Sequence, residues 1–151
     1  MRLALYQPDI AQNLGTILRL CACVGVAAEV IEPCGFPFDD RKFRRAGMDY
    51  IDQTALTRHI SWEAFESWRK ALQPTARLIL LTTKSTENYT AFTFQKDDIL
   101  LLGRESAGVP DEVHHAADAR ITIPMMPGAR SLNIAVAAAM VVGEALRQIS
   151  L

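Results

Sequence analysis

Two short runs in the second half of the sequence are apolar throughout their centres: RLILLTT at residues 77–83 and DILLLG at residues 98–103. A strand with one face in water alternates apolar and polar residues, whereas a strand inside a parallel sheet is covered on both faces and lacks this alternation. Such a sheet needs helices on both faces, so the two runs restrict the chain to an α/β arrangement. Residues 2–6, 28–31 and 121–123 are also mostly apolar or β-branched and predict three further strands.

Helical patterns fill the intervals between most of these strands. Residues 12–24 carry apolar side chains along one side, Ser61 caps an amphipathic segment, and Pro110 opens a short helix. Residues 84–96 are polar and predict a loop. Because neither a linker nor a repeat interrupts the alternation, the sequence predicts a single α/β domain over residues 1–151, with a mostly parallel sheet flanked by helices.

The last predicted helix, residues 132–146, is an apolar run in which Asn133 and Glu144 are the clearly polar side chains. A helix on the surface of a monomer shows a polar face, so this helix needs cover on every side, from a core or from a second subunit. Ser131 stands where an N-cap would open it, and Arg130 lies next to it. Free backbone N–H groups at a helix start favour a polar or anionic ligand, although a loop and a capped core helix would explain the same residues.

Three predicted strands end in residues that suit a ligand site. The ends fall at residues 81–83, 103–105 and 123–125, which carry glycine, proline or hydroxyl groups. In open parallel sheets, ligands bind beyond the carboxyl ends of the strands. We therefore expect these three segments to line one pocket.

Composition excludes several classes of protein. Half of the residues are hydrophobic and 22% are charged, as in a folded globular chain, and the net charge of −1 gives no overall attraction to nucleic acid or membrane. No apolar span of about 18 residues or signal peptide is present, so we expect a cytoplasmic protein without membrane contact. Three cysteines are too few and wrongly spaced for a zinc site, and they suit a reducing cytosol.

Any site for a polyanion must therefore be a local patch, and residues 41–45 offer one. This basic cluster consists of Arg41, Lys42, Arg44 and Arg45, with aromatic residues among and around them. Basic residues interleaved with aromatic ones suit RNA phosphates and stacked bases. We predict that the basic cluster binds RNA, and a solvated helix neutralised by nearby aspartates is the alternative.

The common nucleotide-binding and hydrolase motifs are missing from the sequence. No G-x-G-x-x-G follows a predicted strand, and GRESAG at residues 103–108 lacks the lysine of a phosphate-binding P-loop. GARSLN at residues 128–133 does not match the G-x-S-x-G turn of a hydrolase. No partner motif accompanies the histidines, and we predict that all three lie at the surface: His59, His114 and His115.

Three segments together resemble the motifs of the SPOUT-superfamily RNA 2′-O-ribose methyltransferases. NLGTILR at residues 13–19 is similar to the first motif, LGRESAG at 102–108 to the second, and IPM with SLN at 123–125 and 131–133 to the third. They follow the family order and span nearly the whole chain. The resemblance implies a deep C-terminal trefoil knot, an obligate homodimer, and S-adenosylmethionine as cofactor without a metal.

The resemblance also implies which residues form the site. Those implied to bind S-adenosylmethionine are Leu81, Thr82, Gly103, Ile123, Met125, Ser131 and Leu132. Those implied to be catalytic are Arg19, Asn13, Glu105, Ser131 and Asn133. Because a guanidinium does not lose its proton in proteins, we expect Arg19 to bind phosphate and the developing oxyanion, not to act as a base. Ser131 and Asn133 would orient the ribose, and Glu105 would fix either Arg19 or the loop.

Within the superfamily, the likeness is greatest to small single-domain enzymes that methylate tRNA, because DDRKFRRAGMDY and LTTK also match them. This implies methyl transfer to the ribose 2′-hydroxyl of the wobble pyrimidine, C or U, in the anticodon of a leucine tRNA. Gly143 stands where relatives often carry tyrosine, and the chain stops at Leu151 without their C-terminal extension, so the resemblance predicts the cofactor site better than the tRNA contacts. Two alternatives are a 2′-O-methyltransferase of another tRNA or rRNA site and a non-catalytic module that binds RNA or cofactor.

Overall fold

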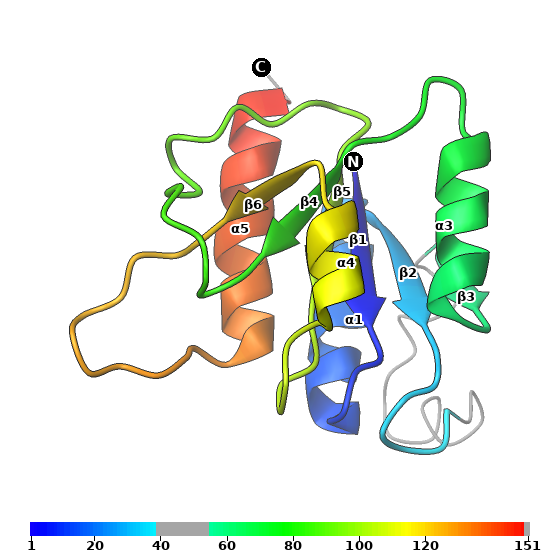
Figure 1. Cartoon of the computed structure of the whole chain (residues 1–151), viewed down its shortest axis with the longest axis horizontal. Helices are drawn as coiled ribbons and strands as arrows, with labels where there is room; N and C mark the ends of the chain where they lie inside the picture. Colours follow the sequence, from blue (N-terminus) through cyan, green and yellow to red (C-terminus); the bar gives the residue numbers. More distant parts are fainter. Residues whose placement is uncertain (39–54, 150–151) are drawn as a thin grey trace.

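The computed structural model of the protein describes residues 1–38 and 55–149, which form one parallel sheet with helices on both faces (Figure 1). The elements in chain order are β1 (Arg2–Tyr6), α1 (Ala11–Val24), β2 (Ala27–Ile31), β3 (Leu56–His59), α3 (Trp62–Ala71), β4 (Leu78–Leu81), β5 (Ile99–Leu102), α4 (Asp111–Ala116), β6 (Ala119–Ile121) and α5 (Ile134–Ile149). The six strands lie in the order β3-β2-β1-β5-β4-β6, and every neighbouring pair is parallel. The predicted α/β fold with a mostly parallel sheet is confirmed.

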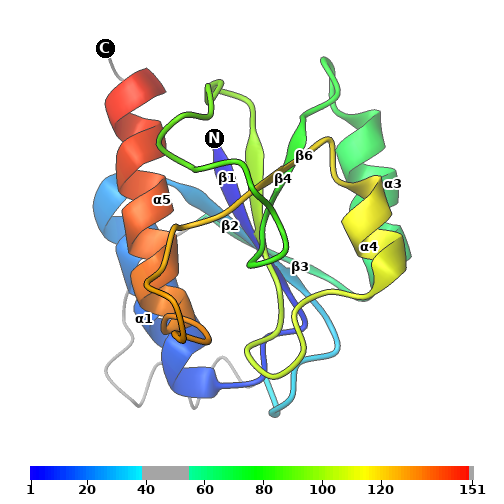
Figure 2. The same cartoon turned by 60° about the vertical axis from the view of Figure 1, so that its left-hand side comes forward.

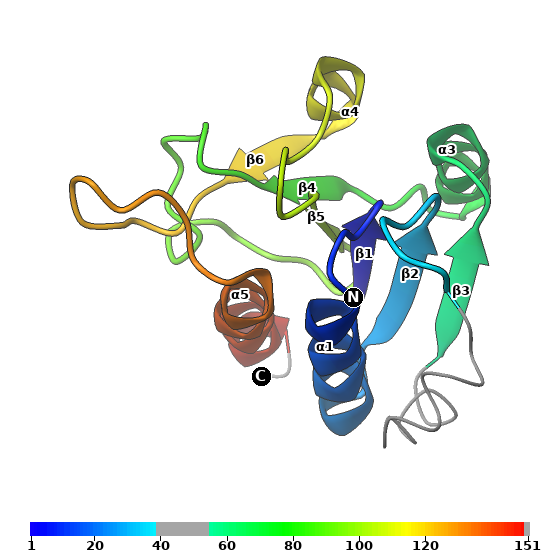
Figure 3. The same ribbon diagram turned by 90° about the horizontal axis from the view of Figure 1, so that it is seen from below.

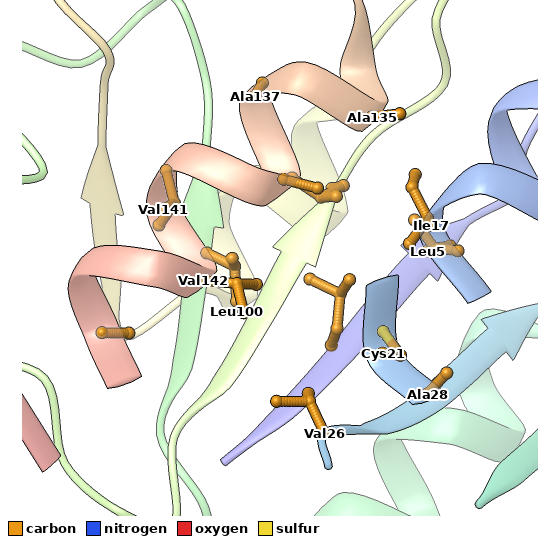
Figure 4. Close-up of a cluster of buried hydrophobic side chains, with 14 of the residues drawn as sticks. Leu5, Ile17, Cys21, Val26, Ala28, Leu100, Ala135, Ala137, Val141 and Val142 are labelled. Atoms are coloured by element: carbon orange, nitrogen blue, oxygen red, sulfur yellow. The ribbon is translucent and has the colours of Figure 1, made fainter. Parts of the chain in front are cut away.

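The two helical layers explain why the strands do not alternate. Helices α1 and α5 cover one face of the sheet, and α3 and α4 cover the other (Figures 2 and 3). In β5, Leu100 and Leu102 belong to the core under α1 and α5, whereas Leu101 belongs to the core under α3 and α4. Figure 4 shows the first of these cores, in which Val141 and Val142 of α5 pack near the sheet.

Strand β3 lies at one edge of the sheet, and no sequence pattern predicts it. Thr57 and Arg58 at its centre are exposed, and β3 pairs with β2 alone. An edge strand needs little apolar surface, so an apolar run does not mark it.

The capping predictions have different outcomes for two helices. Ser61 caps α3, because its hydroxyl accepts a hydrogen bond from the backbone N–H of Ala64 at 3.2 Å. The prediction that Ser131 caps the last helix at residue 132 is wrong. Helix α5 begins at Ile134, and the Asn133 side chain accepts a hydrogen bond from the N–H of Ala135 at 2.8 Å.

The strand predicted at residues 121–123 is also displaced, since β6 ends at Ile121. Beyond this residue the chain leaves β4 and pairs with the loop that follows it. The N–H of Thr122 donates to the Glu87 carbonyl at 2.8 Å, and its carbonyl accepts from the Tyr89 N–H at 3.0 Å. The change of partner ends the strand and ties residues 87–89 to the start of the loop that leads to α5.

Helix α5 has one buried and one exposed apolar face. Ala138 and Val142 are buried against the sheet and α1, whereas Val136 and Met140 are exposed over 51% and 38% of their surface. The expectation of an apolar helix that one domain does not cover completely is confirmed. Among the described helices, none has the length and apolar character that crossing a bilayer requires.

Candidate active site

A pocket of about 510 Å³ lies beyond the carboxyl ends of β4 and β5, between them and the start of α5. Its volume lies in the range of small-molecule sites. The residues expected from the sequence that line it are Asn13, Leu81, Thr82, Gly103, Glu105, Ile123, Met125, Ser131, Leu132 and Asn133. The three strand ends therefore meet around one cavity, as predicted from their place in a parallel sheet.

The turn at residues 103–108 forms one wall of the pocket and requires its two glycines. Arg104 and Gly108 exchange backbone hydrogen bonds of 2.9 and 2.8 Å, which close the turn. A Cβ on Gly103 would lie 2.7 Å from the carbonyl carbon of Gly108, and Gly108 itself has a φ of +62°. A side chain at Gly103 would force the turn open, so the pocket wall is exposed backbone at this point.

A chain of hydrogen bonds connects the first, second and third motifs across the pocket. The Asn133 amide donates to Asn13 Oδ1 at 3.1 Å, and the Asn13 amide donates to Glu105 Oε1 at 3.2 Å. The other oxygen of Glu105 accepts from the N–H of Asp9 at 2.9 Å. Because Asn133 also caps α5, the helix start, the turn and α1 are held in one arrangement.

Glu105 and Arg19 lie in different surroundings. Glu105 fixes the loop after β1 and Asn13, which agrees with one of its two predicted roles. Arg19 lies on an exposed side of α1, about 9 Å along the helix axis from Asn13, and is not among the described residues that line the pocket. Its assignment as a catalytic residue stays a prediction.

Asp9 supports the turn at the pocket wall without lining the pocket, and the sequence patterns do not reveal it. Its carboxylate accepts hydrogen bonds from both the N–H and the hydroxyl of Ser106, and the Ser106 hydroxyl bond lowers the pKa of Asp9. A Cβ on Gly35 would lie 3.0 Å from the Asp9 Cα, so the loop after β2 packs closely here. The Pro8-Asp9 pair marks a turn in the sequence, but only the fold brings it to Ser106.

The histidine predictions are only partly correct. His115 is exposed, but His59 is buried and its Nε2 lies 2.8 Å from the carboxylate of Glu29, so the surface prediction is wrong for His59. His114 is half-buried and lines the pocket, and the surface prediction is wrong for it as well. Sequence spacing could not place it there, because α4 reaches the pocket only through its packing on the sheet.

Basic side chains outnumber acidic ones around the pocket. Lys84, Arg104 and Arg130 line it, whereas Glu105 is the acidic residue in the lining. Both oxygens of Glu105 already accept hydrogen bonds from the protein. The lining therefore favours a ligand, or a pair of ligands, that brings negative charge.

Two further predictions concern other parts of the chain. The basic cluster of Arg41, Lys42, Arg44 and Arg45 lies outside the described residues. Within residues 1–38 and 55–149, no group of three or more His, Cys, Asp or Glu side chains could hold a metal ion.

The comparison with known families fits this arrangement of motifs. The model of the SpoU rRNA Methylase family matches residues 1–143. The chain belongs to the SpoU methylase family. A relative in this family from Beijerinckia indica, named tRNA (cytidine(34)-2′-O)-methyltransferase, is 66% identical over 97% of this chain and 91% of its own length. The Escherichia coli K12 protein of the same name is 44% identical over 99% of this chain and 94% of its own length.

Solved structures of SpoU-type enzymes share the fold. One, described as "Structural insights into the 2-OH methylation of C/U34 on tRNA", has a TM-score of 0.88 and 37% identity, and covers 99% of this chain and 91% of its own. An AdoMet-bound rRNA methyltransferase from Sinorhizobium meliloti has a TM-score of 0.85 and 28% identity, and the match covers 97% of this chain and 55% of that one. The extra length of the second structure lies outside the part that resembles this domain.

Proposed function

We propose that the protein transfers a methyl group from S-adenosylmethionine to the ribose 2′-hydroxyl of the wobble pyrimidine, C or U, in a tRNA anticodon, with leucine tRNA as the substrate. One observation carries this proposal: the three motif segments meet in one pocket of a SpoU-family chain. Relatives named for this reaction are similar over more than nine-tenths of both chains. Because the proposed substrate is a tRNA, we include a cytoplasmic location in the proposal.

The pocket fits the cofactor. Its volume of about 510 Å³ holds a nucleoside with an amino-acid side arm. Leu81, Leu102 and Ile123 give it an apolar wall, and the bare backbone at Gly103 lets a flat ring approach closely. An AdoMet-bound structure among the similar proteins supports the same cofactor. Leu81, Thr82, Gly103, Ile123, Met125, Ser131 and Leu132 are the residues that would hold it.

S-adenosylmethionine supplies a methyl group on a positively charged sulfur, and the transfer breaks the sulfur–carbon bond while forming an oxygen–carbon bond. The protein must align the 2′-hydroxyl with that bond and stabilise the oxygen as its proton leaves. Asn133 and Ser131, at the start of α5, orient the ribose. Arg19 binds phosphate and the developing negative charge, and because it keeps its proton it is not the base.

Asn13 and Glu105 act on this site by fixing Asn133. The Asn133 amide is oriented by Asn13 at 3.1 Å, which is oriented in turn by Glu105 at 3.2 Å. An Asn side chain can rotate at little cost, so this chain of bonds determines which of its atoms faces the ribose. Loss of Glu105 would therefore lower the rate of methyl transfer while the protein still folds.

The fold at the pocket supports the trefoil knot that we include in the proposal. The loop after β4 is bonded to both sides of the end of β6, through Ser85 to the Arg120 carbonyl at 2.7 Å and through Thr122 to Glu87 at 2.8 Å. The chain then continues to α5, on the opposite face of the sheet from α4 (Figure 3). A knotted C-terminal half would pass across the sheet at this point.

A homodimer is the second structural part of the proposal. The exposed face of α5 presents Val136 and Met140, and Val24 of the neighbouring α1 is 39% exposed. Apolar surface on two adjacent helices suits a second copy of the chain. Arg19 lies on α1 as well, about 140° around the helix axis from Val24, and we include its contact with a partner subunit in the proposal.

A wobble-deoxy substrate tests the acceptor atom. An anticodon stem-loop with a 2′-deoxyribose at the wobble position should bind like the unmodified RNA, because phosphate contacts dominate affinity. It should accept no methyl from labelled S-adenosylmethionine. Transfer to the deoxy stem-loop would move the acceptor to a base or to another nucleotide, and transfer only to other tRNA or rRNA would favour the alternative substrates.

A further inference from the structure

The pocket has a second polar end, and the family resemblance implies no role for the two residues that form it. Arg104, on the turn after β5, and His114, on α4, both line the cavity. Arg104 lies near Tyr6, whose ring belongs to the core under α3 and α4, whereas Asn13 and Asn133 begin α1 and α5 on the other face of the sheet. The pocket therefore extends across the carboxyl edge of the sheet, from the amides at one end to Arg104 and His114 at the other.

The contacts of His114 determine which ring nitrogen carries its proton. The Nε of Arg120 lies 3.0 Å from His114 Nδ1. A guanidinium can only donate, so Nδ1 accepts and the ring hydrogen is on Nε2. His114 Nε2 is buried and has no hydrogen-bond partner within the part of the chain that the structure describes. It is a donor without an acceptor.

Arg104 has a similar unsatisfied donor. Its Nε is buried and lacks a hydrogen-bond partner among residues 1–38 and 55–149. Its Nη1 donates to Gln7 Oε1 at 3.4 Å, which is long for an N–H···O bond. The backbone N–H and carbonyl of Arg104 are both fixed by Gly108, so the side chain extends from a rigid turn. Nothing in the described structure neutralises this guanidinium through an ion pair.

We propose that Arg104 and His114 form an oxyanion subsite, which binds a carboxylate or phosphate oxygen of the ligands in the pocket. The inference rests on the proposed function, because it assigns a part of the same pocket. Buried donors without acceptors are rare in folded proteins, and a functional role or a bound ion is among the explanations for them. A guanidinium and an imidazole N–H are both donors, and each can donate to an oxygen of an oxyanion that reaches this end of the pocket.

Two groups in the proposed reaction carry such oxygens. One is the carboxylate of the amino-acid arm of S-adenosylmethionine, and the other is an RNA phosphate next to the wobble ribose. Glu105, the acidic residue in the lining, already accepts from Asp9 and Asn13 and does not satisfy the subsite. Both sources use the same chemistry, so the experiment must separate them.

Arg104→Met removes the donors and keeps an apolar stem of similar length, and Arg104→Lys restores the charge. Lys96→Met is the matched control, since it removes an exposed positive charge that does not line the pocket. Calorimetric titration would compare S-adenosylhomocysteine, which has the carboxylate, with 5′-methylthioadenosine, which lacks the amino-acid arm. A labelled anticodon stem-loop would report RNA binding to the same variants.

If the subsite binds the cofactor carboxylate, Arg104→Met should weaken S-adenosylhomocysteine about tenfold or more and leave 5′-methylthioadenosine unchanged. If it binds a phosphate, both small ligands should keep their affinity, while the stem-loop binds about tenfold less tightly and its salt dependence falls by about one unit of slope. Lys96→Met should reproduce neither pattern, and Arg104→Lys should recover part of the affinity.

The subsite is refuted if Arg104→Met and His114→Phe leave all three affinities within about twofold of the wild type. In that case, methyl transfer by the wild type would leave the proposed function intact. A wild type that binds neither S-adenosylhomocysteine nor the stem-loop would refute both proposals.

Discussion

Two arginines on the same face of the sheet differ in how many hydrogen bonds and ion pairs they make with the protein. Arg69 of α3 is 5% exposed and bonds to Glu66 at 2.6 and 3.1 Å, to the Ala76 carbonyl at 2.7 Å and to Asp118 at 3.2 Å. Arg104 lines the pocket with one long bond to Gln7 and a buried Nε without a partner. The first arginine is used to hold the fold, and the second is left for a ligand.

The carboxylate beside Arg69 shows the same saturation. Burial raises the pKa of Glu66. Hydrogen bonds and charges from Arg69 and Lys70 lower the pKa by more than burial raises it, so the net pKa is below its ordinary value. A fully paired buried charge contributes to stability, while an unpaired one is costly. The contrast between Arg69 and Arg104 therefore predicts different results for the same substitution.

Arg69→Met should lower the free energy of unfolding by about 3 kcal/mol, because the buried Glu66 loses its two hydrogen bonds to Arg69 and keeps the ion pair with the exposed Lys70. Arg104→Met should change that free energy by less than about 1 kcal/mol, since it removes a weak contact with Tyr6. Urea unfolding at neutral pH measures both. Equal losses in the two variants would contradict the distinction between a structural and a ligand-binding arginine.

Asn133 combines both uses in one side chain, and two substitutions separate them. Asn133→Asp keeps an oxygen to cap α5 but loses the amide that donates to Asn13. It should retain wild-type stability and lower methyl transfer about 100-fold. Asn133→Ala should lose the same activity and also about 1 kcal/mol of stability. Normal transfer by the aspartate variant would show that the amide does not position the ribose.

Helix α5 offers a similar contrast, between buried and exposed apolar surface. Val136→Lys places a charge on the exposed face, and it should weaken the dimer about tenfold or more while the fold is kept. Val142→Lys, six residues along the helix, places the charge in the buried core and should prevent folding. Analytical ultracentrifugation and circular dichroism distinguish the two. A wild type that sediments only as monomer at micromolar concentration would refute the dimer.

The smallest effect is expected at Asp9, where a hydrogen bond from Ser106 lowers the pKa below its ordinary value of 3.8. Because the folded pKa is depressed, the stabilisation is fully present above the unfolded pKa and is lost as the pH falls through the folded pKa. Ser106→Ala should therefore be slightly less stable than the wild type at pH 7, and the difference should shrink below pH ~4. Urea unfolding at several pH values tests this; a difference that persists in acid would assign it to another cause.

Sequence reasoning succeeded where one local pattern determines one element. The runs ILLL and LILL were sufficient to predict buried parallel strands, and Ser61 was sufficient to predict the start of α3. It failed where the partner is distant along the chain. β3 lacks an apolar pattern because it is an edge strand, and β6 ends early because Thr122 changes its partner from β4 to the loop at residues 87–89.

The site shows the same division. Motif residues such as Asn13, Glu105 and Asn133 could be named from the sequence, but their mutual hydrogen bonds span 92 and 120 residues and follow only from the fold. Arg104 lies in the second motif segment without a role implied for it, and His114 lies outside all three segments, so only the meeting of α4 with the turn after β5 reveals them as pocket residues. The roles of Arg19 and of the basic cluster stay predictions.

The position of β1 in the middle of the sheet has a consequence for synthesis of the chain on the ribosome. Arg2 pairs with Ala27 on one side and with Ile99 on the other, so one neighbour of β1 is made early and the other almost 100 residues later. At about 5–20 residues per second, the second edge of β1 waits roughly 5–20 s for its partner. During that interval an apolar strand edge is open to other chains. The yield of folded protein should therefore fall as the concentration of nascent or refolding chains rises.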